Sequence, residues 1–219
     1  MGRFMLSGSA PNLSPLVAQG AAVKDAEFCS ANAVPNQSLV VGDGGGIANV
    51  FIFLDEAPKG YEPPEELPEL VFDQDNCTFE PHGLVVQVGQ TVKVMNADGC
   101  AHNTNMKVIR NKAFNQVVNG NDRTGVPLIY EKPEPSPIQA ACDFHAWMKA
   151  YHLVVDHPFA ACSKADGTFE IKNLPAGTHK FRIWHESAGL LERGLKVEIK
   201  PGVDNQLEQS YAIGDFADL

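Results

Sequence analysis

The sequence lacks several features that would each point to a class of protein. It has no run of eighteen apolar residues, so no transmembrane helix is predicted. Basic residues are few, 17 Lys and Arg against 27 Asp and Glu, and the net charge of −10 argues against a nucleic-acid partner. Neither Gly-Lys-Ser/Thr nor a helix signal follows the glycine-rich run at 42–46, which favours a flexible turn over a phosphate loop. Residues 1–6 contain one positive charge but no apolar core, so we expect no signal peptide there; if the protein is exported, its signal precedes this numbering.

The composition indicates a chain of short strands. The 219 residues are 44% hydrophobic, enough for one large domain or two small ones. Fifteen Pro and nineteen Gly supply many turns, and between residues 70 and 155 a β-prone segment recurs every eight to twelve residues. This spacing is typical of a β-sandwich or barrel, and we predict an all-β fold.

Segments outside the β-prone runs are expected to be irregular. Residues 114–123 are rich in Asn and Gly and predict a long loop, and residues 25–29 predict at most one helical turn. Residues 55–69 are acidic and proline-rich, and their second half, 61–69, predicts an extended linker between domains. The expected strands are residues 3–8, 39–41, 47–54, 69–73, 77–79, 84–88, 91–95, 104–109, 126–130, 138–141 and 150–155.

Three donor side chains are spaced three residues apart on one short segment: Cys142, His145 and Met148. Thiolate and thioether favour copper, and imidazole suits it too. A further His, His102, follows the strand that ends at Asn96 and a turn-like stretch. Taken alone, the short segment is equally compatible with a structural Cys, a surface His and a core Met.

With the upstream His102 and Asn103, the pattern resembles the cupredoxin family, and the two-residue gaps resemble its short-loop, amicyanin-like members. The resemblance covers roughly residues 75–157. It implies a Greek-key β-sandwich that holds one type 1 (blue) copper ion. By this resemblance the metal ligands are His102, Cys142, His145 and Met148.

The resemblance also implies roles for neighbouring residues. Asn103 would tie the His102 strand to the Cys142 loop, outside the ligand set itself. Phe144, Ala146 and Trp147 would form an apolar collar around the metal. His145 would reach the surface through that collar and be the point where electrons enter.

The implied function is one-electron transfer with a redox protein such as a cytochrome. A copper enzyme is disfavoured, since such enzymes carry a second catalytic copper with several extra His, and the sequence has no His-x-His pair. Two alternatives stay open: a copper storage or delivery protein with a more exchangeable site, and a structural or adhesion scaffold without redox use. The other histidines give little indication of a metal site: His82, His152, His157, His179 and His185. His185 lies in a Trp-His-Glu string, which is only weak evidence for a second metal site.

The cysteine count bears on both the metal and the compartment. If Cys142 binds copper, Cys29, Cys77, Cys100 and Cys162 remain. These four could form two disulfides in any of three pairings, or stay as free buried thiols. Disulfides would imply a periplasmic or extracellular protein. A disulfide at Cys142 would remove it from the ligand set.

A second signature lies at residues 166–178, where a turn, a strand and a Pro-Gly turn follow one another. This string resembles the carboxypeptidase regulatory-like domain, a small transthyretin-like β-sandwich, whose later strands would be residues 179–185 and 195–199. We therefore expect residues 1–60 and 160–219 to form one sandwich, with a cupredoxin domain at 70–159 inserted into it. A tandem arrangement is the alternative, and a Cys29–Cys162 bridge would fit the insertion.

Overall fold

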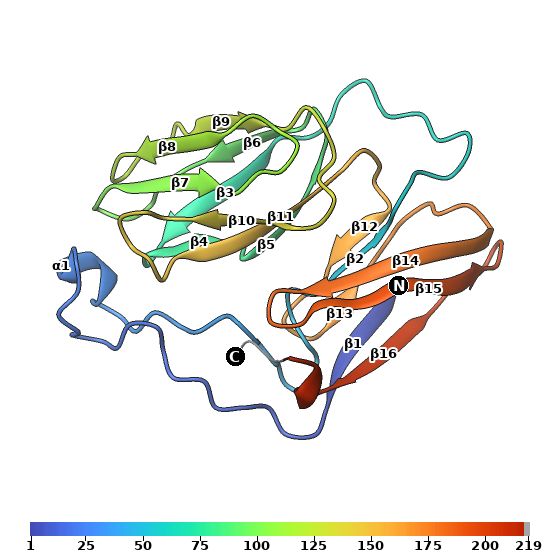
Figure 1. The fold of residues 1–219 in the computed structure, drawn as a ribbon, viewed down its shortest axis with the longest axis horizontal. Coiled ribbons are helices and arrows are strands. Elements are labelled where there is room, and N and C mark those ends of the chain that lie inside the picture. The colour runs from blue at the N-terminus through green and yellow to red at the C-terminus, as the bar shows by residue number, and fades with distance from the viewer. Residues whose placement is uncertain (217–219) are drawn as a thin grey trace. The chain divides into compact units, whose positions relative to one another are not determined.

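The computed structural model describes residues 1–216, and the regular secondary structure of these residues is almost entirely β-strand (Figure 1). The predicted all-β fold is confirmed: within the described part, 16 strands form four sheets. The two helical segments there are α1 (Ala26–Cys29) and the 3-10 turn η1 (Ile213–Asp215). Neither has the length and apolar character needed to cross a membrane. The last three residues of the predicted 160–219 segment lie outside the described part.

The chain divides into two compact units. Unit 1 comprises Met1–Leu13, Gln37–Pro63 and Asp156–Leu219, and unit 2 comprises Ser14–Asn36 and Pro64–Val155. The main difference from the expected boundaries is residues 14–36, which were assigned with the rest of residues 1–60. They belong instead to unit 2, because a disulfide joins Cys29 to Cys77 and the Phe28 ring packs against the unit 2 core.

Unit 1 is built from both ends of the chain. One sheet has the order β13-β1-β16 and the other β12-β2-β14-β15. The central strand β1 runs antiparallel to β13 and parallel to β16. Along β1 every second side chain is buried, including Phe4 and Leu6, as expected for a strand with one face on a core. The bounds are β1 Gly2–Ser7, β2 Phe51–Leu54, β12 Ala160–Cys162, β13 Thr168–Phe169, β14 Gly177–His185, β15 Gly189–Ile199 and β16 Leu207–Ala212.

Unit 2 is a two-sheet sandwich. Its sheets have the orders β5-β11-β10-β7-β8 and β4-β3-β6-β9. Buried residues from both sheets, such as Phe72, Val94 and Val154, form one hydrophobic cluster between them. The bounds are β3 Leu70–Asp75, β4 Thr78–Glu80, β5 Gly83–Gln87, β6 Thr91–Val94, β7 His102–Met106, β8 Phe114–Val118, β9 Val126–Ile129, β10 Ile138–Ala141 and β11 Lys149–Val155.

Three local predictions are wrong. Residues 114–118 form strand β8 rather than loop, because β7 supplies a hydrogen-bonding partner along its length and the polar Asn and Gln side chains face outward. The expected strand 47–54 begins only at Phe51, since Asn49 adopts a left-handed conformation (φ 59°) that interrupts it. Residues 39–41 form no strand; a single bridge pairs Val41 with Ile47 around the glycine-rich turn.

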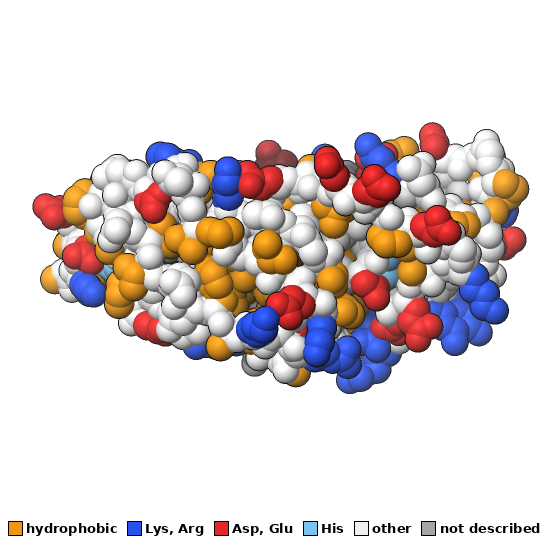
Figure 2. All heavy atoms as spheres, turned by 90° about the horizontal axis from the view of Figure 1, so that it is seen from above, with side chains coloured by type: hydrophobic (Ala, Val, Ile, Leu, Met, Phe, Trp, Pro, Cys, Tyr) orange, Lys and Arg blue, Asp and Glu red, His pale blue; other side chains and the backbone are white. Residues whose placement is uncertain are grey.

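The surface is mixed in character. On the face drawn in Figure 2, acidic and basic side chains are interspersed and hydrophobic side chains also reach solvent. Residues 62–66 of the acidic segment are exposed and carry no regular structure, as expected for a linker.

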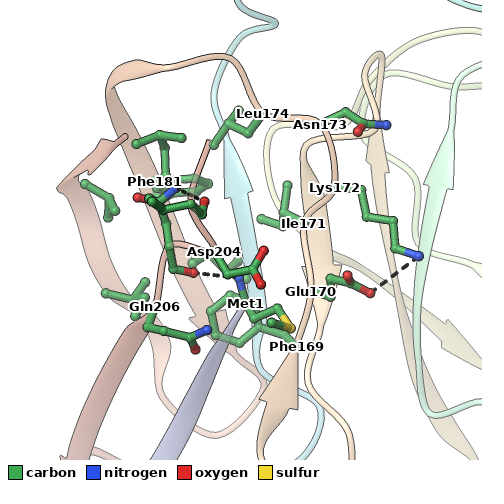
Figure 3. Close-up of a pocket in the computed structure, with 16 residues that line it drawn as sticks. Met1, Phe169, Glu170, Ile171, Lys172, Asn173, Leu174, Phe181, Asp204 and Gln206 are labelled. Atoms are coloured by element: carbon green, nitrogen blue, oxygen red, sulfur yellow. Dashed lines mark hydrogen bonds and ion pairs between the residues drawn. The ribbon is translucent and has the colours of Figure 1, made fainter. Parts of the chain in front are cut away.

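Unit 1 contains an open pocket of about 330 Å³ (Figure 3). Ile52, Phe169 and Phe181 contribute apolar lining, and the Glu170 and Lys172 side chains form an ion pair at 3.5 Å. No His or Cys is among the residues that line this pocket. It therefore contains neither the thiol nor the imidazole groups that the predicted metal site requires.

Candidate metal centre

The predicted donors come from two parts of unit 2. His102 is the first residue of β7, and the loop between β10 and β11 contains Cys142, His145 and Met148. Two backbone hydrogen bonds shape this loop: Cys142 N donates to Met148 O at 3.4 Å and Met148 N donates to His145 O at 2.9 Å. All four side chains are buried, with exposed fractions between 0% and 3%. A loop that closes on itself places the three donors at one end of the sandwich.

Three donor atoms meet in a small triangle. His102 Nδ1 lies 2.9 Å from His145 Nδ1, and Cys142 Sγ lies 4.0 Å and 3.8 Å from these two nitrogens. Bonds to a metal of about 2.0 Å from nitrogen and about 2.3 Å from sulfur reach a common point close to the plane of such a triangle. The three donors therefore fit one ion in a trigonal arrangement, the set that the sequence pattern predicts.

Carboxylates determine which imidazole nitrogens face one another. Asp98 Oδ2 lies 2.9 Å from His102 Nε2, and Asp25 Oδ2 lies 3.0 Å from His145 Nε2. A carboxylate only accepts, so each Nε2 bears the hydrogen and both Nδ1 lone pairs point toward the triangle. Two lone pairs at 2.9 Å repel each other unless a proton or a metal ion lies between them. Carboxylate partners of this kind are typical of metal-binding histidines.

The protonation states follow from these contacts. Burial alone lowers the pKa of His102, but the hydrogen bond to Asp98 outweighs it and raises that pKa above its ordinary value. Burial raises the pKa of the Cys142 thiol, but the neighbouring His102 and His145 imidazoles outweigh it and lower this pKa to about 6. A His102 imidazole with a raised pKa thus lies beside a Cys142 thiol with a lowered pKa, and both changes favour the thiolate, the form in which cysteine binds a metal.

Asn103 joins the two donor-bearing segments. Its Oδ1 accepts hydrogen bonds from the Asp143 backbone N–H at 2.7 Å and from the Cys142 thiol at 3.4 Å. Its Nδ2 donates to Asp143 Oδ2 at 2.8 Å and to Asn115 Oδ1 at 2.7 Å. Strand β7 and the Cys142 loop are therefore held in fixed register next to the donor sulfur.

His145 departs from what the resemblance implies. It is 0% exposed rather than at the surface, because Asp25 of the segment 14–36 covers its Nε2 edge. Within the expected collar, Phe144 is 37% exposed, Ala146 is exposed, and Trp147 packs on His145 with ring centroids 5.1 Å apart. The expectation that His145 reaches the surface is therefore wrong for this structure.

The cysteines pair differently from the suggested bridge. Cys29 joins Cys77, whereas Cys100, Cys142 and Cys162 are free, so Cys142 is available as a donor. Cys100 is buried with its Sγ 3.6 Å from His102 Nε2, and burial raises its pKa to about 11. Within residues 1–216, every other group of three close donors includes Cys29 or Cys77, whose sulfurs are already bonded to each other.

Sequence reasoning missed two carboxylates that contact the candidate donor imidazoles. Asp98 precedes His102 by four residues, and the turn between them is held by three hydrogen bonds from Asn96 to carbonyl groups. This short spacing from a candidate donor His could have identified Asp98 from the sequence. Asp25 lies 120 residues from His145 in the sequence and offered no such signal. The histidines given little weight, such as His152 and His185, lie outside every group of close donors in the described residues.

No protein-family model matches the sequence, and no curated protein matches it. Solved structures show a partial likeness. A copper-containing nitrite reductase from Thermus scotoductus SA-01 is 21% identical over 45% of this chain and 24% of that chain, with a TM-score of 0.36. A reduced Cu(I) form of an amicyanin mutant is 21% identical over 41% and 86% of the two chains (TM-score 0.35), and a purple cupredoxin from Nitrosopumilus maritimus is 23% identical over 39% and 97% (TM-score 0.32). The likeness spans about a quarter of the reductase, and with TM-scores below 0.5 it adds no argument to the site geometry.

Proposed function

We propose that unit 2 is a cupredoxin-type domain that binds one copper ion and transfers single electrons. The observation that supports this most is the buried triangle of His102 Nδ1, His145 Nδ1 and Cys142 Sγ, with both imidazoles oriented by carboxylates. Met148, 1% exposed on the same loop, is proposed as the axial ligand. When bound, copper supplies one-electron chemistry by alternating between Cu(I) and Cu(II).

The chain's own residues serve this role by holding the donors still. Electron transfer is fast when little has to move, and the hydrogen bond from the Asp143 N–H to Asn103 Oδ1 restricts movement of the Cys142 loop relative to β7. Trp147 packs on the His145 ring and its Nε1 donates to Cys77 O at 3.2 Å, which keeps this side of the site dry. Rigid donors and low water access favour redox cycling over metal exchange.

Burial of the donors supports this function over the alternatives. A storage or delivery site has to release its metal, and three donors that are at most 3% exposed offer no open path for exchange. A scaffold without redox use has no need of a thiolate whose pKa is lowered to about 6. A redox protein such as a cytochrome is the proposed partner.

The compartment and the second unit belong to the same proposal. The Cys29–Cys77 disulfide supports a periplasmic or extracellular location, where such bonds persist. Unit 1, in which β1 and β2 each share a sheet with strands from β12 to β16, is proposed as the carboxypeptidase regulatory-like sandwich into which unit 2 is inserted.

Electron counting tests the function. The copper-loaded protein should take up one electron per chain from ascorbate, return it to an oxidant, and keep its metal over repeated cycles. Loss of copper to a chelator at each reduction would favour delivery instead. A bound copper that neither accepts nor returns an electron would contradict electron transfer.

A further inference from the structure

The segment 14–36 lies on the candidate metal centre although it is more than a hundred residues away from the donor loop in sequence. Asp25 contacts His145 Nε2, and Lys24 Nζ lies 4.5 Å from the centre of the Phe144 ring. The Phe28 ring packs against the unit 2 core beside Gly99, where any larger side chain would overlap it. Three successive contacts thus run along the edge formed by the donor loop and the turn before β7.

This segment has one covalent attachment to the rest of unit 2. The Cys29–Cys77 disulfide lies four residues after Asp25. The segment also closes on itself, since Val17 and Val34 form an isolated antiparallel β-bridge and Gly20 N donates to Ser30 O at 2.8 Å. It is therefore a small closed loop fastened at the end nearest the metal centre.

Asp25 acts on His145 in the way that Asp98 acts on His102. By accepting the Nε2 hydrogen, it leaves the Nδ1 lone pair facing the other donors. Its backbone is left-handed (φ 52°, ψ 41°), a conformation that Asp tolerates better than most residues, and this geometry aims the carboxylate at the ring. The carboxylate itself is 35% exposed, whereas the imidazole is fully buried. Asp25 is thus what separates His145 from solvent on this side.

We propose that residues 14–36 form a tethered cover on the metal centre, in which Asp25 is the residue that positions His145. The proposal rests on the proposed function, because it assigns the cover to that same site. A partner protein reaches His145 only after the cover has been displaced. Cleavage of the disulfide by a thiol reductant, with two electrons and two protons taken up by the two sulfurs, removes the tether and favours displacement.

Positioning by Asp25 is tested on the copper-free, full-length protein by ¹⁵N NMR of the histidine rings. Wild type should show His145 with its hydrogen on Nε2. Asp25→Ala should lose this preference, and Asp25→Asn should restore it, because the amide oxygen still accepts the hydrogen bond. Glu27→Ala, an exposed acid on the same segment, is the matched control and should resemble wild type. An unchanged His145 tautomer in Asp25→Ala would overturn the positioning role.

The cover itself is tested by modification of copper-free protein with diethyl pyrocarbonate, mapped by mass spectrometry. His145 should be protected in wild type and react at least about tenfold faster in the Cys29→Ser/Cys77→Ser variant, while His102, equally buried but held by Asp98, stays protected. Gly99→Ala is a second variant that keeps the disulfide and displaces Phe28.

Two results would overturn the cover: equal protection of His145 in wild type and both variants, or exposure of His102 together with His145. Neither measurement uses copper. If both measurements give the expected results but the protein forms no thiolate–copper complex, the cover is supported and the proposed function is rejected. If the protein forms that complex but both measurements fail, only the cover is rejected.

Discussion

Asn103 illustrates how a single side chain connects two parts of the site. One amide bonds the Asp143 backbone, the Cys142 thiol and two further side chains. We predict that Asn103→Ala lowers the free energy of unfolding by about 1–3 kcal/mol, because the Asp143 N–H loses its acceptor. Copper affinity should fall by roughly 10- to 100-fold, since the Cys142 loop loses the hydrogen bond from the Asp143 N–H that holds it to β7.

Competition with a copper chelator measures this affinity, and chemical unfolding measures the stability. Asn115→Ala is the control: Asn115 bonds Asn103 and Asp143 on the exposed side and touches no donor. An Asn103→Ala protein with the affinity of the control would show that the register of the loop does not depend on this amide.

The side chains that the sequence pattern singled out lie close together, whereas the contacts around them were not predicted. Cys142, His145 and Met148 are close in sequence, so their clustering follows from local chain geometry alone. The burial of His145 depends on Asp25, and nothing local relates residues 120 positions apart. The position of Asp98 follows from the turn that Asn96 holds through hydrogen bonds to the carbonyl groups of Cys100, Val118 and Asn119. Two of these carbonyl groups come from a distant part of the chain, so the sequence around Asp98 does not show the turn.

At the scale of single elements, strand β11 contains His152, a buried imidazole that makes the stability of unit 2 depend on pH. His152 is fully buried, packs edge-on against Phe72, and accepts or donates one hydrogen bond with the Tyr130 hydroxyl at 2.9 Å. Burial lowers its pKa to about 3. Below about pH 6.5 the unfolded chain therefore binds a proton at His152, whereas the folded protein does not. Its contribution to stability is therefore present above pH 6.5 and lost as the pH falls toward 3.

We predict that unit 2 loses up to about 2 kcal/mol of stability between pH 7 and pH 5 through His152. Hydrogen exchange at the β10 and β11 amides measures this loss. His152→Phe should flatten the dependence, whereas Tyr130→Phe, which removes the hydroxyl but keeps the imidazole, should retain it. An unchanged slope in His152→Phe would assign the acid sensitivity elsewhere.

The disulfide determines how residues 14–36 contribute to unit 2. It closes a stretch with a sequence separation of 48, for which the chain-entropy account gives about 4 kcal/mol. We predict a loss of this order in Cys29→Ser/Cys77→Ser, read from chemical unfolding followed by Trp147 fluorescence in a Trp184→Phe background. Cys162→Ser, a free cysteine of unit 1, should leave this transition in place. A double variant as stable as wild type would show that the unfolded chain gains no freedom from losing the bond.

Strand β8 shows why the sequence pattern predicted a loop where the structure has a strand. Its sequence is rich in exposed polar residues, and only Val118 is buried, so the pattern indicates loop. What makes it a strand is the run of five paired residues on β7. An edge strand of this kind depends on its neighbour rather than on its own hydrophobic pattern, whereas the core strands, with Phe72 or Val94 at alternating buried positions, are predictable from sequence.

On the scale of the whole molecule, strands from both chain ends share the sheets of unit 1. In the parallel pair β1 and β16 six residues are in register, and β2 lies between β12 and β14. We predict that proteolysis within the exposed linker 62–66 leaves the two fragments associated under native conditions, because separating them would break both sheets. Thiol reductant is required in this test, since the Cys29–Cys77 bond also joins the fragments.

Co-elution of the fragments in size-exclusion chromatography with reductant is the expected result, and their dissociation should need denaturant. Free separation without denaturant would contradict the insertion and favour two sandwiches in tandem.

The central claim is that His102, Cys142 and His145 bind one copper ion, and the most direct measurement is the visible absorption spectrum during titration of metal-free protein with Cu(II). We predict an intense thiolate-to-copper band that saturates at one copper per chain and is absent in Cys142→Ser. A colourless complex, or a band that persists in Cys142→Ser, would contradict the account.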